Sequence, residues 1–300
     1  MGREAWRAIA TDHFDIDQQR FFNPWGQVDR GLPDLLKWWT TAKREPWPRA
    51  VTNRPYLAPP GAVSGGQAAV TMIGHCTVLV RVDGFSLLTD PHFSTHAGPF
   101  GRLGTPRVRP PGLEPRDLPA INAVFISHNH YDHLDVPSLR WLTAQRAPAF
   151  VTPLGLKAPL ERKGIGPVIE LDWWESTDVI GAEITATPAL HWSNRTMFDR
   201  RRTLWGGCML RVPEAPLIYF AGDSGYAPFF GPIRERRHLR IDELPGNLSD
   251  ALDALEKDEV VQNALGRHIY EHFLEAKRNE WQEYIERVSG WEISRYLTVY

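Results

Sequence analysis

Three histidines and an aspartate lie close together in residues 127–135, namely His128, His130, Asp132 and His133. In an extended segment, side chains two residues apart point the same way, so His128 and His130 can hold one metal ion while Asp132 and His133 face a second. Neutral imidazole and carboxylate suit zinc or another borderline divalent ion, and two ions about 3.5 to 4 Å apart would share a hydroxide as nucleophile. The alternative is a solvated polar loop, but four potential ligands in this order seldom arise by chance.

An apolar segment precedes these ligands and must position them. Residues 121–126 are short, largely apolar and rich in β-branched side chains, which is typical of a buried strand. Catalytic loops follow the carboxyl ends of strands in layered α/β folds. The sequence therefore predicts a metal site at the edge of a sheet.

Four other segments accompany the histidine motif along the chain: residues 73–80, 88–91, 187–193 and 219–226. Together they resemble the metallo-β-lactamase superfamily, whose signature is His-x-His-x-Asp-His, and within it the branch of N-acylphosphatidylethanolamine phospholipase D. The segments occur in the family's order, and the similarity covers roughly residues 15–235. The resemblance implies an α/β fold of the αββα sandwich type and a metal-dependent hydrolase.

The resemblance also implies two groups of metal ligands. The first ion is held by three histidines, His128, His130 and His191. The second ion is held by Asp132 and His133, and Asp223 bridges both ions. Asp132 would also orient the hydroxide and accept its proton. The implied cofactor is zinc, as one or two ions, with other divalent metals as alternatives.

Two of these ligands have support from their local sequence. His191 follows the alternating strand pattern of residues 183–187, and Asp223 follows the apolar residues 217–220 within Gly-Asp-Ser-Gly. The alternatives are an ordinary loop histidine and an aspartate that only begins a glycine-rich turn. The upstream motif favours the ligand interpretation for both.

Other residues are assigned supporting or peripheral positions. Asp90 follows an apolar strand pattern and resembles the carboxylate that fixes the tautomer of a ligand histidine. His75 and Tyr131 either line the site or only pack near it. The remaining histidines before the motif are predicted to be surface or loop residues: His13, His92 and His96.

The family pattern is not continued after Asp223. The fold family normally adds further strand and helix elements and a final histidine for the second metal, whereas the later histidines here follow no strand pattern: His238, His268 and His272. Residues 241–300 instead resemble the carboxyl-terminal helices of glutamine synthetase, an oligomer-contact region without that enzyme's nucleotide, glutamate or metal ligands. The expected architecture is a sandwich truncated at its C-terminal end with an appended helical tail that lacks ligase activity.

Composition changes near the same position. Of 25 prolines only Pro245 lies after residue 240, and residues 241–300 have an excess of acidic residues whereas residues 1–240 have an excess of basic ones. We therefore expect an incomplete hydrolase domain over 1–240 and a helical domain over 241–300.

Capping residues predict three helices in the tail. Asn247 or Ser249 can cap a first helix that ends at Leu255, and Gly266 can end a second. A longer helix follows, with an apolar stripe that either covers the surface left by the missing lactamase-fold elements or drives self-association. The stripe consists of Tyr270, Phe273, Leu274, Trp281, Tyr284, Ile285 and Val288.

The remaining composition limits location and partners. A net charge of −2 gives no argument for nucleic-acid binding. Cys76 and Cys208 lie outside any paired motif, which predicts reduced thiols in a cytoplasmic protein. The N-terminus has no apolar run, so we expect no signal peptide. Residues 32–39 combine Trp with Lys, so they either form an amphipathic helix peripheral to a membrane or pack on the sandwich.

The predicted reaction is hydrolysis of a phosphodiester, in a small molecule or a phospholipid, by metal-bound hydroxide, as in a phospholipase D-like phosphodiesterase. Because the final histidine ligand is missing, we expect impaired activity. A lactonase or other ester hydrolase is the alternative within the same superfamily. An inactive chimeric chain whose tail mediates assembly is the alternative from another class.

Overall fold

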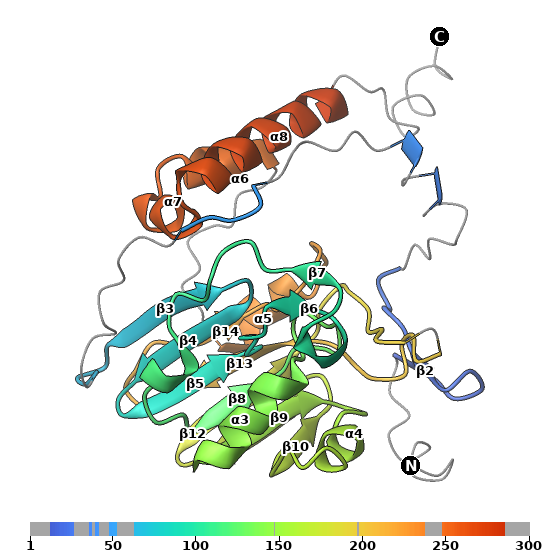
Figure 1. Ribbon diagram of the computed structural model, residues 1–300, viewed down its shortest axis with the longest axis vertical. Coiled ribbons are helices and arrows are strands. Elements are labelled where there is room, and N and C mark those ends of the chain that lie inside the picture. Colours follow the sequence, from blue (N-terminus) through green and yellow to red (C-terminus); the bar gives the residue numbers. More distant parts are fainter. Residues whose placement is uncertain are drawn as a thin grey trace. The chain divides into compact units, whose positions relative to one another are not determined.

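The computed structural model describes residues 13–26, 36–37, 40–41, 48–52, 63–146, 148–196, 198–237 and 248–285. The chain divides into two compact units, Met1–Arg236 and Arg237–Tyr300 (Figure 1). This division lies close to the change in composition at residue 240.

The described part of the first unit contains a mixed sheet of six strands. They are β3 (Ala68–Gly74), β4 (Thr77–Val82), β5 (Phe85–Thr89), β8 (Ala123–Phe125), β9 (Ala149–Pro153) and β10 (Val168–Leu171). Their order is β10-β9-β8-β5-β4-β3. β10, β9, β8 and β5 are parallel, whereas β4 and β3 pair antiparallel with their neighbours. The segment predicted as a strand over 121–126 is β8.

A second sheet of four described strands is antiparallel throughout. Its strands lie in chain order: β11 (Ser176–Val179), β12 (Ala182–Thr187), β13 (Gly207–Arg211) and β14 (Ile218–Phe220). Two short hairpins complete the described strands: β1 (Phe14–Asp15) with β2 (Arg20–Phe21), and β6 (His96–Ala97) with β7 (Thr105–Pro106).

The two sheets share one apolar core, and successive residues of the central strands point to opposite faces. In β5, Leu87 packs against residues of the second sheet, whereas Leu88 packs on the other face. In β8, Phe125 faces the second sheet and Val124 faces away from it. Both faces of these strands are buried, so neither strand alternates between apolar and polar residues, although β5 also buries the polar Ser86 and Thr89.

Helices cover the outer face of the six-stranded sheet. α3 (Val136–Arg146) and α4 (Lys157–Glu161) lie against this face, as Figure 1 shows in green. Leu139 of α3 and Leu160 of α4 pack in the same cluster as Val124. α5 (Phe230–Arg237) begins beside the second sheet: the ring centroid of its first residue, Phe230, lies 6.3 Å from that of Tyr219 in β14. Two short 3₁₀ helices, η1 (Pro99–Gly101) and η2 (Pro115–Asp117), lie in the connections.

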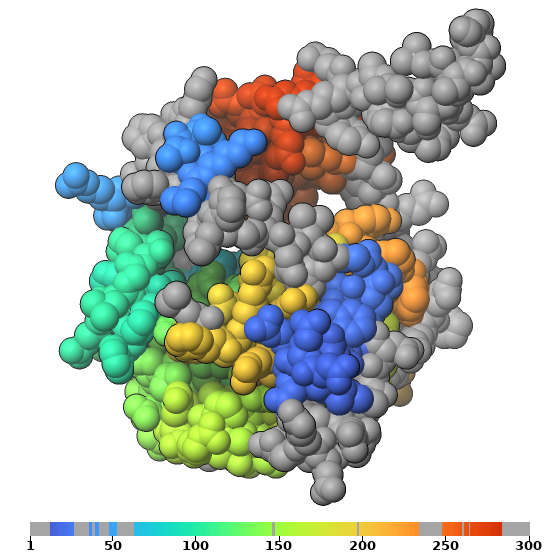
Figure 2. Space-filling model, turned by 90° about the vertical axis from the view of Figure 1, so that its right-hand side faces the viewer, coloured from blue at the N-terminus to red at the C-terminus, as the bar shows by residue number. Residues whose placement is uncertain are grey.

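The β1–β2 hairpin is anchored on the segment that carries His191. Figure 2 shows the hairpin in dark blue beside that yellow segment, and the Phe21 amide donates to the Arg201 carbonyl at 2.8 Å. His13 is buried there, with Nε2 2.8 Å from Asp172 Oδ1 and its ring stacked on Trp173. His13 was predicted to be a surface or loop residue; it lies in a turn before β1, but it is not at the surface, because a carboxylate and an aromatic face compensate for its burial.

His92 was also predicted to be a surface or loop residue, and it is buried. Its Nδ1 lies 2.8 Å from Nη2 of Arg107, a residue well separated from it in sequence. His96 is half-buried in β6. Most of residues 32–39, the candidate interfacial helix, lies outside the described residues.

The described part of the second unit is helical, with α6 (Leu248–Leu255), α7 (Glu259–Leu265) and α8 (Arg267–Ile285). The predicted helix end at Leu255 is confirmed, and Gly266 ends α7 in a left-handed conformation with φ of 75°. Arg278 of α8 pairs with Asp253 of α6 and, at 2.9 Å, with Glu256 just after α6. No described helix has the length and apolar character needed to cross a membrane.

The predicted apolar stripe of α8 is only partly covered. Tyr270, Leu274 and Trp281 are half-buried, and Phe273 is exposed. The Tyr284 and Ile285 side chains and Val288 lie outside the part that the structure describes. The described stripe therefore stays a candidate contact surface.

Candidate metal centre

The topology brings five separate segments to one edge of the sandwich. β5 and β8 are parallel neighbours, so Asp90 and the histidine motif follow strand ends at the same edge. β12 and β14 are both antiparallel to β13, so their ends, which precede His191 and Asp223, also share an edge. The β3–β4 turn, which carries His75, adjoins the end of β5 because Val78 pairs with Thr89.

Three histidine nitrogens converge as a first ligand group. His128 Nε2 lies 2.8 Å from His130 Nδ1, and His191 Nε2 lies 3.2 Å from each of these two atoms. Zinc–nitrogen bonds of about 2.0–2.1 Å in a tetrahedron place ligand atoms about 3.3 Å apart. The spacing of these three nitrogens therefore fits a zinc-like ion.

A second group lies beside the first and shares Asp223 with it. Asp223 Oδ2 is 3.2 Å from His133 Nε2 and 3.7 Å from His191 Nε2, so this carboxylate contacts both groups. Asp132 Oδ2 lies 3.8 Å from His133 Nε2, and the Asp132 side chain is 44% exposed. The structure thus brings together all six ligands that the resemblance implies.

The electrostatics of the first group suit metal binding. Burial, followed by the neighbouring histidines, holds the pKa of His128 well below its usual range. The same order of causes lowers the pKa of His191 to about 4, and burial also lowers the pKa of His130. Uncharged imidazoles are the form that binds a metal ion.

The second group attracts positive charge. Burial disfavours a charged His133, but the hydrogen bonds and charges of Asp223 and Asp90 outweigh it and raise the pKa of His133 to about 10. Burial likewise opposes ionisation of Asp132 and Asp223, yet the adjacent histidines hold the pKa of both carboxyls below its usual value. Several carboxylates lie around one imidazole, and a bound divalent cation would stabilise their negative charge.

Asp90 fixes the orientation of His133. The Asp90 side chain is fully buried, and its carboxylate accepts hydrogen bonds from His133 Nδ1 at 2.8 Å, the Ser127 amide at 2.7 Å and the Ser127 hydroxyl at 2.6 Å. With Nδ1 donating to Asp90, Nε2 of His133 is the atom left to face a metal. Asp90 therefore has the position expected of a carboxylate behind a ligand histidine.

We expect Asp90→Asn to weaken zinc binding by about tenfold to a hundredfold, the usual cost of losing such a supporting carboxylate. The amide places an NH₂ group where the carboxylate accepted a hydrogen bond, so His133 loses its fixed tautomer. Competition against a chromophoric chelator measures the affinity, with Asp117→Asn at the exposed η2 helix as control. Equal affinities for Asp90→Asn and the unchanged chain would contradict this role.

Arg195 supports the histidine loop and was not singled out from the sequence. Its Nη1 donates to the carbonyls of Asn129 at 3.1 Å and Leu134 at 2.7 Å, and its guanidinium lies 4.0 Å from the centre of the Tyr131 ring. These contacts brace both ends of the ligand motif. They join positions about sixty residues apart, so no local pattern could have indicated them.

Gly222 allows Asp223 to approach the histidine loop. Its φ is 60°, and a Cβ at this position would lie 2.9 Å from the Ser127 Cβ. Side chains larger than hydrogen are therefore excluded by both conformation and space. This requirement explains the glycine of the Gly-Asp-Ser-Gly segment.

A pocket of about 430 Å³ adjoins the second ligand group. His75, Tyr131 and Asp132 line it, together with His92 and Arg107. The structure thus places His75 and Tyr131 at the site itself. The Arg107 guanidinium is held by the carbonyls of His92, at 2.5 Å, and Ser94, at 3.2 Å. This arginine was also missed from the sequence alone.

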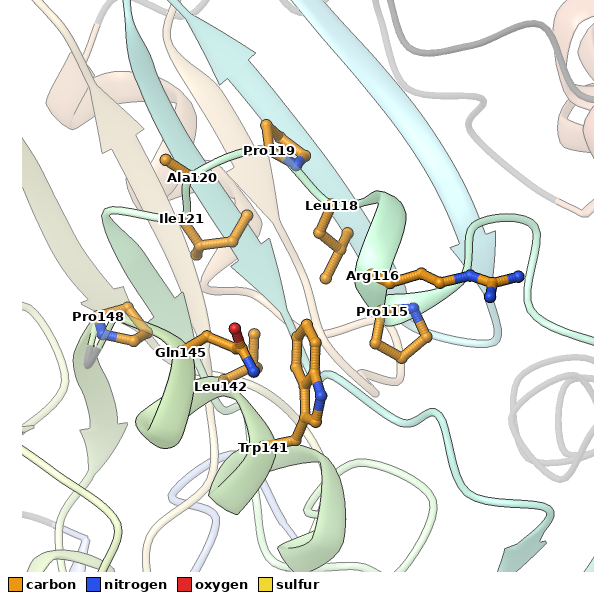
Figure 3. A pocket seen from close by; sticks show the side chains of 10 residues that line it. All are labelled: Pro115, Arg116, Leu118, Pro119, Ala120, Ile121, Trp141, Leu142, Gln145 and Pro148. Carbon is orange, nitrogen blue, oxygen red and sulfur yellow. The ribbon is translucent and has the colours of Figure 1, made fainter.

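A second hollow of about 450 Å³ lies at the other end of β8 (Figure 3). Ile121, before β8, and Trp141 and Leu142 of α3 contribute to its lining, whereas the ligand motif follows β8. Its lining includes none of the candidate metal ligands. The pocket beside the histidines is therefore the candidate substrate site.

Comparison with known families agrees with this geometry. The family model described as the beta-lactamase superfamily domain matches residues 86–244, just over half of the chain. That range includes Asp90, the histidine motif, His191 and Asp223. The chain therefore belongs to the β-lactamase superfamily, and the resemblance found in the sequence is confirmed, as is its αββα fold class.

Individual relatives match the same region. An uncharacterized protein of Mycobacterium tuberculosis is 38% identical over 181 residues, which are 59% of this chain and 48% of the relative. The N-acyl-phosphatidylethanolamine-hydrolyzing phospholipase D 1 of Caenorhabditis elegans is 36% identical over 166 residues, or 52% of this chain and 46% of that protein. The chain thus spans less than half of the length of these relatives.

The tail has a different relationship. The glutamine synthetase catalytic domain model matches residues 230–296, beginning before the predicted boundary at 241. Glutamine synthetase of Thermus thermophilus is 54% identical over 68 residues, which are 23% of this chain but only 15% of that enzyme. The predicted similarity of the tail is confirmed for this short segment.

Proposed function

We propose that this chain hydrolyses phosphodiesters with the help of bound divalent metal, and that its substrate is a phospholipid or a smaller diester. The observation that carries this proposal is the pair of ligand groups joined by Asp223 beside a pocket. When bound there, metal ions supply a nucleophile from water at neutral pH and stabilise negative charge on a phosphoryl group.

The residues around the pocket have distinct roles in this proposal. Asp132 is half-exposed in the pocket and would orient the attacking water and accept its proton. Arg107 would place its positive charge beside the negative charge of the phosphodiester. Neutral esters and lactones carry no such negative charge. The arginine therefore favours a diester over the lactone or ester alternative.

The relatives support the same class of substrate. The Caenorhabditis elegans protein and a Saccharomyces cerevisiae protein, 34% identical over 171 residues, are both named for hydrolysis of N-acyl-phosphatidylethanolamine. Because this chain covers only part of each, the lipid itself is a proposal. Contact with a membrane surface would follow from such a substrate.

A panel of substrates tests the proposal. Zinc-loaded protein is assayed with bis(4-nitrophenyl) phosphate, N-acyl-phosphatidylethanolamine in mixed micelles, an acyl-homoserine lactone and 4-nitrophenyl acetate. We expect turnover of the diesters, and Arg107→Met should lower kcat/KM for them by about tenfold or more, the effect of one charge-assisted hydrogen bond. Lactone turnover without diester turnover would contradict the proposal.

The rival proposal is an inactive chain whose tail mediates assembly. The exposed Phe273 on α8 supports self-association through this unit. Absence of all hydrolysis in metal-loaded protein, together with a concentration-dependent oligomer, would favour that rival. The cytoplasmic location, expected from the free Cys76 and Cys208, stays a prediction.

A further inference from the structure

Within the described residues of the first unit no histidine follows His191, so the final histidine that the family resemblance implies for the second metal is not among them. The chain continues instead into the glutamine synthetase-like helices. We propose that His75 takes the place of this histidine and completes a second metal position with His133, Asp132 and Asp223. The inference rests on the metal binding in the proposed function and not on its substrate.

The position of the His75 ring carries the argument. His75 Nε2 lies 3.2 Å from His133 Nε2 and 3.2 Å from Asp132 Oδ2. His133 Nε2 lies in turn 3.2 Å from Asp223 Oδ2. These separations match the roughly 3.3 Å between ligand atoms of a tetrahedral zinc site. His75 therefore stands at ligand distance from two residues already assigned to the second metal.

The backbone of the β3–β4 turn directs His75 to this place. The pairing of β3 with β4 shifts register between Met72 and Gly74, and His75 follows with a φ of 50°. A left-handed conformation costs free energy at a residue other than glycine and persists where surrounding structure imposes it. His75 and Cys76 form a two-residue hairpin loop between the paired Gly74 and Thr77, and such a loop requires a positive φ at its first residue.

Stability alone does not account for the contact between His75 and Asp132. The two side chains are 46% and 44% exposed, and ion pairs as exposed as this contribute little to folding. A shared cation gives both side chains a reason to converge on His133. Metal ligation therefore explains why this exposed pair forms.

Cys76 is the competing donor in the same turn. Its Sγ lies 3.7 Å from Asp223 Oδ1, and His75, Cys76 and His133 place donor atoms within 4.8 Å of one another. The imidazole of His75 is closer to the ligand atoms of the second group than this thiol is to Asp223. Cys76→Ser is therefore a matched control one residue away.

Zinc stoichiometry tests the assignment without any assay of activity. The full chain is stripped of metal and titrated with Zn²⁺ against a chromophoric chelator. We expect two ions for the unchanged chain and for Cys76→Ser. His75→Asn should retain the first ion and bind the second at least about a hundredfold more weakly, because one ligand is lost. Asparagine suits the variant because it tolerates positive φ.

Each other outcome overturns the proposal. Two ions bound with unchanged affinity by His75→Asn would show that His75 is not a ligand. Loss of the second ion in Cys76→Ser alone would assign the position to the thiol, and a single ion in the unchanged chain would show that the second position is not complete. Retention of the first ion verifies that each variant is folded. Failure of diester hydrolysis leaves these counts unaffected and would overturn only the proposed function.

Discussion

Replacing Asp223 by alanine is expected to lower metal-dependent hydrolysis by at least about a hundredfold. Asp223 Oδ2 contacts both ligand groups, at 3.2 Å from His133 Nε2 and 3.7 Å from His191 Nε2. Removal of a carboxylate behind a single ligand already costs up to about a hundredfold in metal affinity or activity. Loss of a carboxylate that serves two positions should exceed that effect.

Initial rates on bis(4-nitrophenyl) phosphate at saturating zinc measure this expectation. The control is Asp117→Ala, an exposed carboxylate in η2, a segment that precedes β8 and not the ligand loop. It should retain the rate of the unchanged chain. Equal rates for Asp223→Ala and Asp117→Ala would remove Asp223 from the site.

The largest expected loss of stability follows Trp205→Ala. Trp205 is 1% exposed in a cluster with Phe21 and Trp173, and truncation of a buried tryptophan costs about 3–5 kcal/mol of unfolding free energy. Its indole Nε1 also donates to the Ala189 carbonyl at 2.9 Å, close to His191. The variant should therefore bind metal less tightly as well as unfold more readily.

Urea denaturation followed by circular dichroism measures the change in unfolding free energy. Phe198→Ala is the control, because Phe198 is 82% exposed and surface substitutions usually change stability by less than about 0.5 kcal/mol. A Trp205→Ala midpoint equal to that of Phe198→Ala would contradict the packing described for the β1–β2 hairpin and its neighbours.

The convergence of the six candidate ligands was expected from the family resemblance, with support from local sequence signals. Spacing placed His128 and His130 on one ion, and strand patterns preceded His191 and Asp223, each of which the structure brings to the same edge. The carboxyl ends of parallel neighbouring strands lie at the same edge of a sheet. Residues that follow such strand ends were therefore expected to lie close together. The helix end at Leu255 and the break at Gly266 were predictable for the same reason, since caps act locally.

The supporting residues could not be predicted because their contacts are remote in sequence. Arg195 braces a loop about sixty residues away, and Arg107 reaches the pocket through the carbonyls of His92 and Ser94. His13 was expected to be a surface or loop residue because histidine is usually exposed or half-exposed, yet in its turn it is buried and Asp172 compensates for that burial. Tertiary partners decide such positions, and no pattern within a short window contains them.

The central claim is that the folded chain holds divalent metal at the histidine motif. Elemental analysis of freshly purified protein, with His128→Ala prepared in parallel, tests this claim most directly. We expect tightly held zinc or another divalent ion, two per chain when fully loaded, and a loss of at least the first ion in His128→Ala. Protein that retains no metal after loading, or equal metal contents in both proteins, would contradict the claim.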